Sequence, residues 1–287
     1  MRHYVLPLMI LGAIALAAVL AWGVLTHGHF RGPARAAAAD AASQSVQRSL
    51  PPFRSIEVSG LADITLVQGA GYGIAIDGTQ AAVRLVVAEV KGDRLVITQT
   101  SERSGLFGLF GSGPGRAARV TVTLRELDAI EASGAVKITA ETLNTPALKV
   151  AMAGAGALRI DNLQTQSLRV SGSGAVKVEL AGRATEQVVS FAGAGSYRAL
   201  ELVSDDTRAS VSGAGKVLVN AKKTLKISLS GAGLVEYVGN PEVKQSVSGM
   251  GQVRRRDASL DPLHRRFEVA LRSSRAVSAT PPGWSRA

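Results

Sequence analysis

The sequence predicts an all-β fold, a single-stranded parallel β-helix in which each repeat forms one coil of a solenoid. A Gly-x-Gly element recurs about every 18 to 21 residues, and a fixed period of this size is typical of stacked repeats. The residues around each element alternate between apolar and polar, as in Leu168–Leu180. That alternation has the period of a β-strand with one buried face.

The glycines of these elements are expected to be structural corners of the coils. Both glycines of an element share the parity of the apolar residues around it. Two inward glycines would weaken an open strand because they pack nothing, whereas the inner side of a bend has no room for side chains. Incomplete copies stand at Gly60 and Gly134. The predicted corner glycines are Gly154, Gly156, Gly172, Gly174, Gly193, Gly195, Gly213, Gly215, Gly231, Gly233, Gly249 and Gly251.

Residues 1–30 are expected to form an N-terminal signal anchor or signal peptide. Val5–Leu25 is a run of 21 largely apolar residues, and about 20 apolar residues suffice for a transmembrane helix. An uncleaved membrane anchor and an export signal cleaved near Ala34–Ala36 both stay open, and both place the following domain outside the cytoplasm. The membrane topology also stays open, because Arg31 and Arg35 follow the apolar run.

Residues 31–50 lack a periodic pattern and are expected to be a flexible tether. Residues 51–253 form the predicted β-helix domain, with an irregular capping part at 51–128 and regular coils at 129–253. The capping part is interpreted as one irregular coil plus an excursion that covers the N-terminal end. Its expected strands are Ile56–Val67, Gly73–Asp77, Arg94–Thr100 and Arg119–Leu124.

Residues 254–287 are expected to be a disordered, basic tail. The net charge of the chain is +11, of which the tail carries +5, the first 50 residues +3 and residues 51–253 only +3. The tail either keeps the chain soluble or contacts anionic lipid. Because the domain is expected outside the cytoplasm, no nucleic-acid partner is predicted.

The sequence predicts no catalytic residue, cofactor or metal ion. Cysteine is absent, which excludes thiolate metal sites and a Cys nucleophile. The glycine elements lack the third glycine and the helix that a dinucleotide site requires. All four His lie outside residues 51–253, so that region has no His-based catalytic triad. A calcium-binding β-roll needs Asp after each turn, where this chain has Leu158, Val176, Tyr197, Val217, Val235 and Val253.

A carbohydrate-active enzyme using surface carboxylates is the alternative to a non-enzymatic role. The acidic residues of suitable type share no single repeat position, and aromatic residues make up only 4% of the chain, although sugar sites usually contain them. Phe191, Tyr197 and Tyr237 have inward parity and are expected in the core. Two or more carboxylates about 5–10 Å apart in a groove would favour the enzyme. The candidate carboxylates are Asp161, Glu179, Glu201, Asp205, Asp206 and Glu236.

A Gly-rich segment, Ser104–Gly115, is a candidate contact loop. It carries four large apolar residues, and their exposure would favour contact with a membrane or a partner. The alternative is that the segment folds back over the open end of the β-helix core. The four residues are Leu106, Phe107, Leu109 and Phe110.

The chain also resembles a known family. The repeated Ser-Gly-x-Gly units, the opening Ile56–Gly60 with Val67–Gly69, and the run Lys91–Ile97 are similar to the bacterial family "putative auto-transporter adhesin, head GIN domain", a domain of unknown function. The likeness covers about residues 53–253. It implies a right-handed parallel β-helix behind a signal or membrane anchor, and it implies no catalytic residues.

The expected function is that of a non-enzymatic cell-envelope domain, which serves in adhesion or binds a protein or glycan through its side faces. The carbohydrate-active enzyme and an anchored structural or regulatory envelope module stay open as alternatives. The domain is expected on the periplasmic or extracytoplasmic side of a membrane that residues 5–25 cross, or secreted after signal cleavage. The identity of the partner and the oligomeric state stay open.

Overall fold

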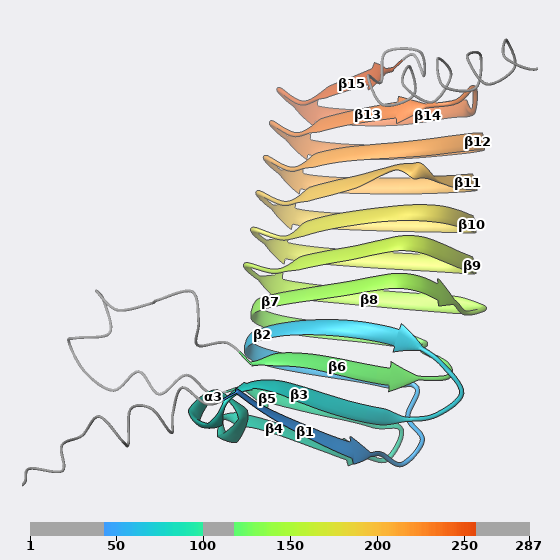
Figure 1. The fold of residues 1–287 in the computed structure, drawn as a ribbon. Helices are drawn as coiled ribbons and strands as arrows, with labels where there is room; N and C mark the ends of the chain where they lie inside the picture. Colours follow the sequence, from blue (N-terminus) through green and yellow to red (C-terminus); the bar gives the residue numbers. More distant parts are fainter. Residues whose placement is uncertain (1–42, 100–117, 257–287) are drawn as a thin grey trace, which may run out of the picture. The chain divides into compact units, whose positions relative to one another are not determined.

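The computed structural model describes residues 43–99 and 118–256 of the chain. Strands contain 79% of these residues and form a β-solenoid of about six turns (Figure 1). The prediction of an all-β solenoid is therefore confirmed. No helix within the described ranges is long and apolar enough to cross a membrane. The predicted signal anchor at Val5–Leu25 lies outside those ranges.

The regular coils stack by parallel pairing of each strand with its counterpart one coil away. The corner glycines stay in register through the stack, with Gly154 opposite Gly174, Gly174 opposite Gly193, and Gly193 opposite Gly213. The strands of this part are β7 (Ala129–Asn144), β8 (Ala147–Gly154), β9 (Ala157–Gly174), β10 (Lys177–Gly193), β11 (Ser196–Gly213), β12 (Lys216–Gly231), β13 (Leu234–Val238), β14 (Glu242–Gly249) and β15 (Gln252–Arg255).

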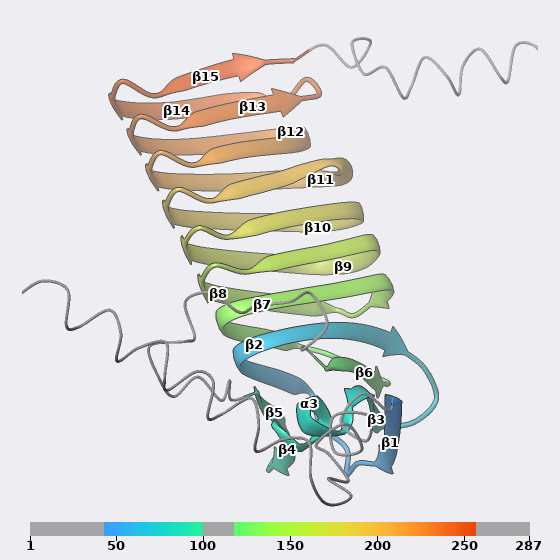
Figure 2. The same ribbon diagram turned by 60° about the vertical axis from the view of Figure 1, so that its left-hand side comes forward.

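Each coil has two sides that meet at the glycine corner, as the two layers of ribbon in Figure 2 show. In β10, the chain leaves the preceding corner along Lys177–Leu180 and bends near Gly182, where the register with β9 shifts. It then runs along Glu186–Gly193 into the next corner. We name the exposed residues of the outgoing segments the post-corner face, and those of the incoming segments the pre-corner face.

The N-terminal end contains one further coil and an excursion. β2 (Ser55–Gln68) pairs in parallel with β7, although the two strands are far apart in sequence. β5 (Arg94–Gln99) pairs in parallel with the first half of β2, and β6 (Arg119–Leu124) pairs in parallel with the second half of β2. Other elements of this end are β3 (Gly73–Thr79), α3 (Gln80–Arg84) and β4 (Val86–Lys91).

Residues 100–117 connect β5 to β6 in the sequence, and β2 turns its corner at Gly60, between the segments that pair with these two strands. The last described residue before them is Gln99, which lies opposite the corner residue Gly60. Gln99 and Ala118, at the two ends of this connection, are both buried. The predicted contact loop Ser104–Gly115 falls within the connection and lies outside the described residues.

Two predicted boundaries need correction. Residues 43–49 are not part of a tether, because they form β1 (Ser43–Ser49), which pairs antiparallel with β3. This strand contains a single apolar residue, Val46, so hydrophobic alternation gave no signal for it. Arg254 and Arg255 belong to β15 and so to the last coil, rather than to the tail.

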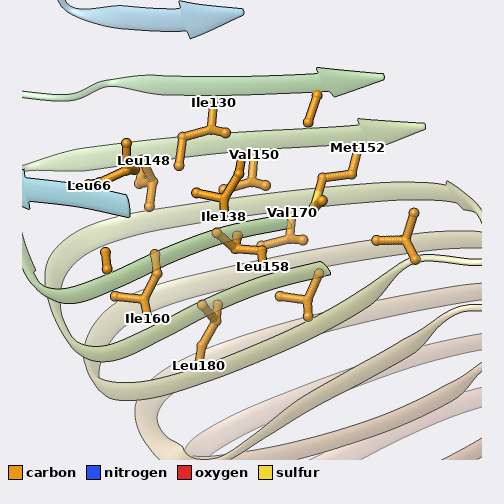
Figure 3. Close-up of a cluster of buried hydrophobic side chains, with 14 of the residues drawn as sticks. Leu66, Ile130, Ile138, Leu148, Val150, Met152, Leu158, Ile160, Val170 and Leu180 are labelled. Atoms are coloured by element: carbon orange, nitrogen blue, oxygen red, sulfur yellow. The ribbon is translucent and has the colours of Figure 1, made fainter. Parts of the chain in front are cut away.

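The core is a continuous column of inward-facing aliphatic side chains. Ile130, Val150 and Val170 come from one side of successive coils, and Ile138 and Leu158 come from the other side (Figure 3). All five are at most 2% exposed. Burying a side chain of this size contributes roughly 1.5–3 kcal/mol relative to leaving it exposed. No single coil encloses such a core, so each coil depends on its neighbours.

The corners contain two kinds of glycine with different reasons for being glycine. Gly154 has φ +103°, and a Cβ at this position would lie 2.7 Å from the carbonyl oxygen of Gly134 in the preceding coil. Gly154 is exposed, whereas Gly156 is buried on the inner side of the bend. The expectation that both glycines face inward therefore holds only for the second. Position 154 requires glycine because its φ is positive and because the backbone of the neighbouring coil lies close to it.

Gly172 is an exception to the predicted corner set. It lies within β9 opposite Met152 and Phe191, and the corner glycine of its coil is Gly174. A Cβ on Gly172 would lie 2.5 Å from Cε1 of Phe191. The position is therefore glycine because the neighbouring ring occupies the space, and Val176 takes the inner position of that corner.

A buried hydrogen bond links two polar side chains inside the solenoid. Gln187 Nε2 donates to the hydroxyl oxygen of Tyr197 over 2.7 Å, and both residues have 0% exposure. Burial raises the pKa of Tyr197 well above its ordinary value, so the phenol stays protonated. Among the described residues, Gln187 Oε1 has no partner.

Tyr197→Phe is expected to lower the free energy of unfolding by about 1–3 kcal/mol, because the buried amide of Gln187 then has no partner at either atom. The double variant Tyr197→Phe/Gln187→Leu should lie closer to the wild type, since it removes both polar groups and Gln187 stands opposite Leu168. Urea denaturation followed by circular dichroism measures both values. Equal stability of Tyr197→Phe and the wild type would contradict the importance of this bond.

Candidate binding groove

The post-corner face contains an open groove of about 490 Å³ that spans β9 to β12. Leu218 lies in its floor, and charged side chains of both signs form its walls. Leu218 has outward parity but is only 3% exposed, so it serves as floor rather than surface. The charged lining residues are Arg159, Asp161, Glu179, Arg198, Glu201, Lys216 and Arg256.

The groove lies where the coil length changes. Gly193 and Gly213 are 20 residues apart, whereas Gly213 and Gly231 are 18 apart. The pairing of β11 with β12 absorbs this difference in two steps. Ala199 pairs with Val219 and Val203 with Asn220, which leaves three extra residues in β11, and a second shift between Ser204 and Asp206 leaves one extra residue in β12. Residues 200–202 therefore have no partner in β12 and form a bulge.

Side-chain hydrogen bonds hold the bulge in place. Asn220 Nδ2 donates to the carbonyl oxygen of Leu200 over 3.0 Å. Ser204 Oγ donates to the carbonyl oxygen of Asn220 over 3.0 Å and lies 2.6 Å from Thr207 Oγ1. Leu202 is fully buried, while Glu201 is exposed beside the groove. The position of Glu201 in the groove wall is thus fixed by these hydrogen bonds to the backbone, rather than by an ion pair of the Glu201 carboxylate.

Charges alternate in sign along the groove. Strand pairing places Glu179 of β10 between Arg159 of β9 and Arg198 of β11, and neighbouring strands lie about 4.8 Å apart. Arg159 Nε lies 2.7 Å from Asp161 Oδ1, and Arg159 Nη1 lies 3.8 Å from Glu179 Oε2. Lys177 Nζ lies 2.9 Å from Glu179 Oε1. The groove therefore offers both anionic and cationic groups to a ligand.

The environment of Glu179 keeps its carboxylate ionised. The hydrogen bond from Lys177 lowers the pKa of Glu179, and the nearby charges of Arg198 and Arg159 act in the same direction. A general acid must hold a proton near neutral pH. Glu179 is thus suited to ion pairing rather than to proton donation.

The structure brings three of the six candidate carboxylates together and separates the others. Asp161, Glu179 and Glu201 line the groove. Asp205 lies 3.0 Å from Lys223, and Asp206 accepts a hydrogen bond from Thr224 over 2.6 Å, both outside the groove lining. Glu236 lies 3.8 Å from both Lys216 and Arg256, where it anchors two lining cations.

The groove also contains residues that were not predicted as functional. Arg159 and Arg198 stand at the same repeat position as Glu179, so comparison of the repeats could have found this column.

The aromatic residues with inward parity lie outside the groove lining. Phe191 and Tyr197 are buried, as their parity predicted, with ring centroids 5.9 Å apart, and Tyr237 is partly buried. Within residues 43–99 and 118–256, no three His, Asp or Glu side chains gather as metal ligands.

Comparison with known structures identifies the fold. A putative adhesin from Bacteroides fragilis has a TM-score of 0.67 and 23% identity, over 75% of this chain and 97% of the other. A putative adhesin from Parabacteroides merdae has a TM-score of 0.58 and 19% identity, over 75% and 96%. A "putative lipid binding protein" from Parabacteroides distasonis has a TM-score of 0.57 and 19% identity, over 75% and 96%. Identities this low establish a shared fold alone.

Comparison with sequences identifies the family. No curated protein matches this sequence. The family described as "Putative auto-transporter adhesin, head GIN domain" matches residues 52–241, which is most of the solenoid and agrees with the resemblance seen in the sequence. The chain therefore belongs to the putative auto-transporter adhesin, head GIN domain family.

Proposed function

We propose that this chain is a non-enzymatic binding module of the cell envelope, with an adhesin-like role, and that the groove on its post-corner face contacts the partner. The mixed-charge groove is the observation that carries this proposal. Its walls present cations and carboxylates in alternation, and Leu218 lies in its floor. A protein surface or a charged glycan supplies complementary groups for such a groove.

The proposal includes a location and a winding sense. The descriptions of the family and of the fold relatives as adhesins favour a site at the cell surface or in the envelope. We propose that Val5–Leu25 anchors the chain, that the solenoid lies on the extracytoplasmic side and that its coils wind right-handed. We also propose the segment carrying Leu106, Phe107, Leu109 and Phe110 as a second contact site.

Replacing groove residues is expected to weaken binding without loss of folding. The purified full-length chain should bind isolated envelopes of the producing cells, and Glu179→Ala/Arg198→Ala should bind about tenfold more weakly, because exposed charge pairs contribute up to about 1 kcal/mol each. Envelopes treated with protease or with periodate distinguish a protein partner from a glycan.

The matched control is Asp63→Ala/Arg119→Ala, which also removes one acid and one base, at positions outside the groove lining. It should bind like the wild type. Wild-type binding by the groove variant would overturn the groove as the contact site. Thermal unfolding followed by circular dichroism verifies that both variants are folded.

A polysaccharide-cleaving activity is the second candidate, favoured by the shared groove of Asp161, Glu179 and Glu201. Incubation of the full-length chain with isolated envelope polysaccharides measures it as new reducing ends. Reducing ends that disappear in Glu179→Gln would establish the enzyme. Their absence, with binding intact, would leave the adhesin-like role.

A further inference from the structure

The pre-corner face carries a column of cations that runs along the solenoid axis. Strand pairing places one residue of each coil from β8 to β14 in this column. Five of the six positions are basic and exposed, and the sixth is a partly buried Val. The column consists of Lys149, Arg169, Val188, Arg208, Lys226 and Lys244.

Columns of small hydroxyl side chains accompany the cations. Two residues nearer to the corner, pairing aligns Ser171, Ser190, Ser210, Ser228 and Ser246. Residues two apart in a strand point to the same side, so the serines lie on the same face as the cations. All five are exposed. The next column toward the corner contains Ser173, Ala192, Ser212, Ser230 and Ser248.

Most of these cations lack the ion pairs that several cations form on the post-corner face. Lys244 pairs with Glu242 at 3.0 Å. Arg159, Lys177 and Lys216 on the other face all lie within 4 Å of a carboxylate. The column members that form no ion pair with any described residue are Lys149, Arg169, Arg208 and Lys226.

Acidic residues limit the positive surface to a narrow line. Glu186, Asp206 and Glu242 lie on the same face, two residues farther from the corner than the cations. Three of the six column positions are therefore bordered by a carboxylate on the side away from the corner, and five of the six by a serine hydroxyl on the other side. Such a line attracts an anion that is itself linear, whereas a broad anionic plane would also meet the carboxylates.

We propose that the pre-corner face binds a linear acidic polysaccharide that lies along the solenoid axis. Its carboxylates contact the Lys and Arg column, and its hydroxyls exchange hydrogen bonds with the serine columns. The five steps between six coils span about 24 Å at about 4.8 Å each. A sugar unit in an extended chain has a length comparable to one step, so successive units meet equivalent positions.

The serine hydroxyls favour a glycan over a nucleic acid, whereas the lack of exposed aromatic residues in the described ranges counts against stacking of either bases or sugar rings. Proteins that bind single strands stack the bases on aromatic side chains. None of the exposed large hydrophobic residues in the described ranges is aromatic. Serine hydroxyls, by contrast, both donate and accept hydrogen bonds, as sugar hydroxyls do.

The test measures binding of the full-length chain to polygalacturonate at low and physiological salt. Arg169→Glu/Arg208→Glu/Lys226→Glu is expected to bind at least about tenfold more weakly than the wild type, and wild-type binding should weaken as salt increases. Neutral dextran should not bind. Arg169→Ala/Arg208→Ala/Lys226→Ala replaces the reversal variant if that variant does not fold.

The matched control is Arg48→Glu/Arg119→Glu/Lys137→Glu, which makes the same change in net charge at exposed positions elsewhere. The basic residues after Arg256 are present in every variant, so their contribution cancels. Equal loss in the control, or no binding of polygalacturonate by the wild type, would overturn the proposal. So would tighter binding to poly(dT) or to phosphatidylglycerol vesicles. Groove variants should keep polygalacturonate binding, which separates this proposal from the previous one.

Discussion

Gly174→Ala is expected to destabilise the protein by about 3–5 kcal/mol, close to the upper end for single substitutions. The backbone at Gly174 has φ +93°, which costs a residue with a Cβ about 1–2 kcal/mol. The added Cβ would also lie 2.6 Å from the carbonyl oxygen of Gly154. That carbonyl is held in place because it accepts a hydrogen bond from Ala175 N over 2.8 Å.

Two other glycines separate the contributions of φ and of the close approach. Gly92 has φ +63° and open space at its Cβ position, so Gly92→Ala should cost only about 1 kcal/mol. Gly71 has open space and no positive φ, so Gly71→Ala should change stability by less than about 0.5 kcal/mol. Urea denaturation of the full-length variants gives the three values. Equal costs at Gly174 and Gly92 would show that the neighbouring carbonyl is unimportant.

Phe191→Ala is expected to cost about 3–5 kcal/mol, because it opens a cavity that the surroundings cannot fill. Phe191 is 2% exposed, and its ring occupies the space beside two residues without side chains, Gly172 and Gly195. It also packs against Tyr197. Phe191→Leu conserves more volume and should cost clearly less than Phe191→Ala.

A second substitution tests this packing directly. Gly172→Val alone should destabilise the protein, because its Cβ would lie 2.5 Å from the ring of Phe191. In the Phe191→Ala background the same change should be stabilising, since it adds volume where the ring was. A double-mutant cycle in urea measures the coupling. Additive effects at the two positions would contradict the proposed contact.

The alternation of apolar residues was sufficient to predict the strands of the regular coils, because a solenoid strand buries one face along its whole length. The spacing of the repeats could not show whether Gly172 or Gly174 is the corner glycine, since either position fits a period of about 18 to 21 residues. The contact that separates them is with Phe191, which is 19 residues away in sequence. β1 gave no signal because its pairing uses the backbone of β3 rather than an apolar face.

The groove was harder to predict than the coils. Glu179 was a candidate by residue type, but its cationic neighbours Arg159 and Arg198 become visible only when coils are compared at equal repeat position. Glu201 reaches the groove through the bulge at residues 200–202, whose cause is a change of coil length. A local pattern does not contain that information, because it depends on how two neighbouring coils align.

Each corner glycine lies against the carbonyl oxygen of the corner glycine in the preceding coil, and this contact has an evolutionary consequence. A change of one or two residues within a coil must be absorbed by a bulge, as in β11, whereas gain or loss of a whole coil leaves every corner contact in place. The coil is thus the natural unit of duplication and deletion in this chain. Each added coil would lengthen both charged columns by one position, so a lineage can match the length of its binding face to its ligand by copying a short stretch of gene.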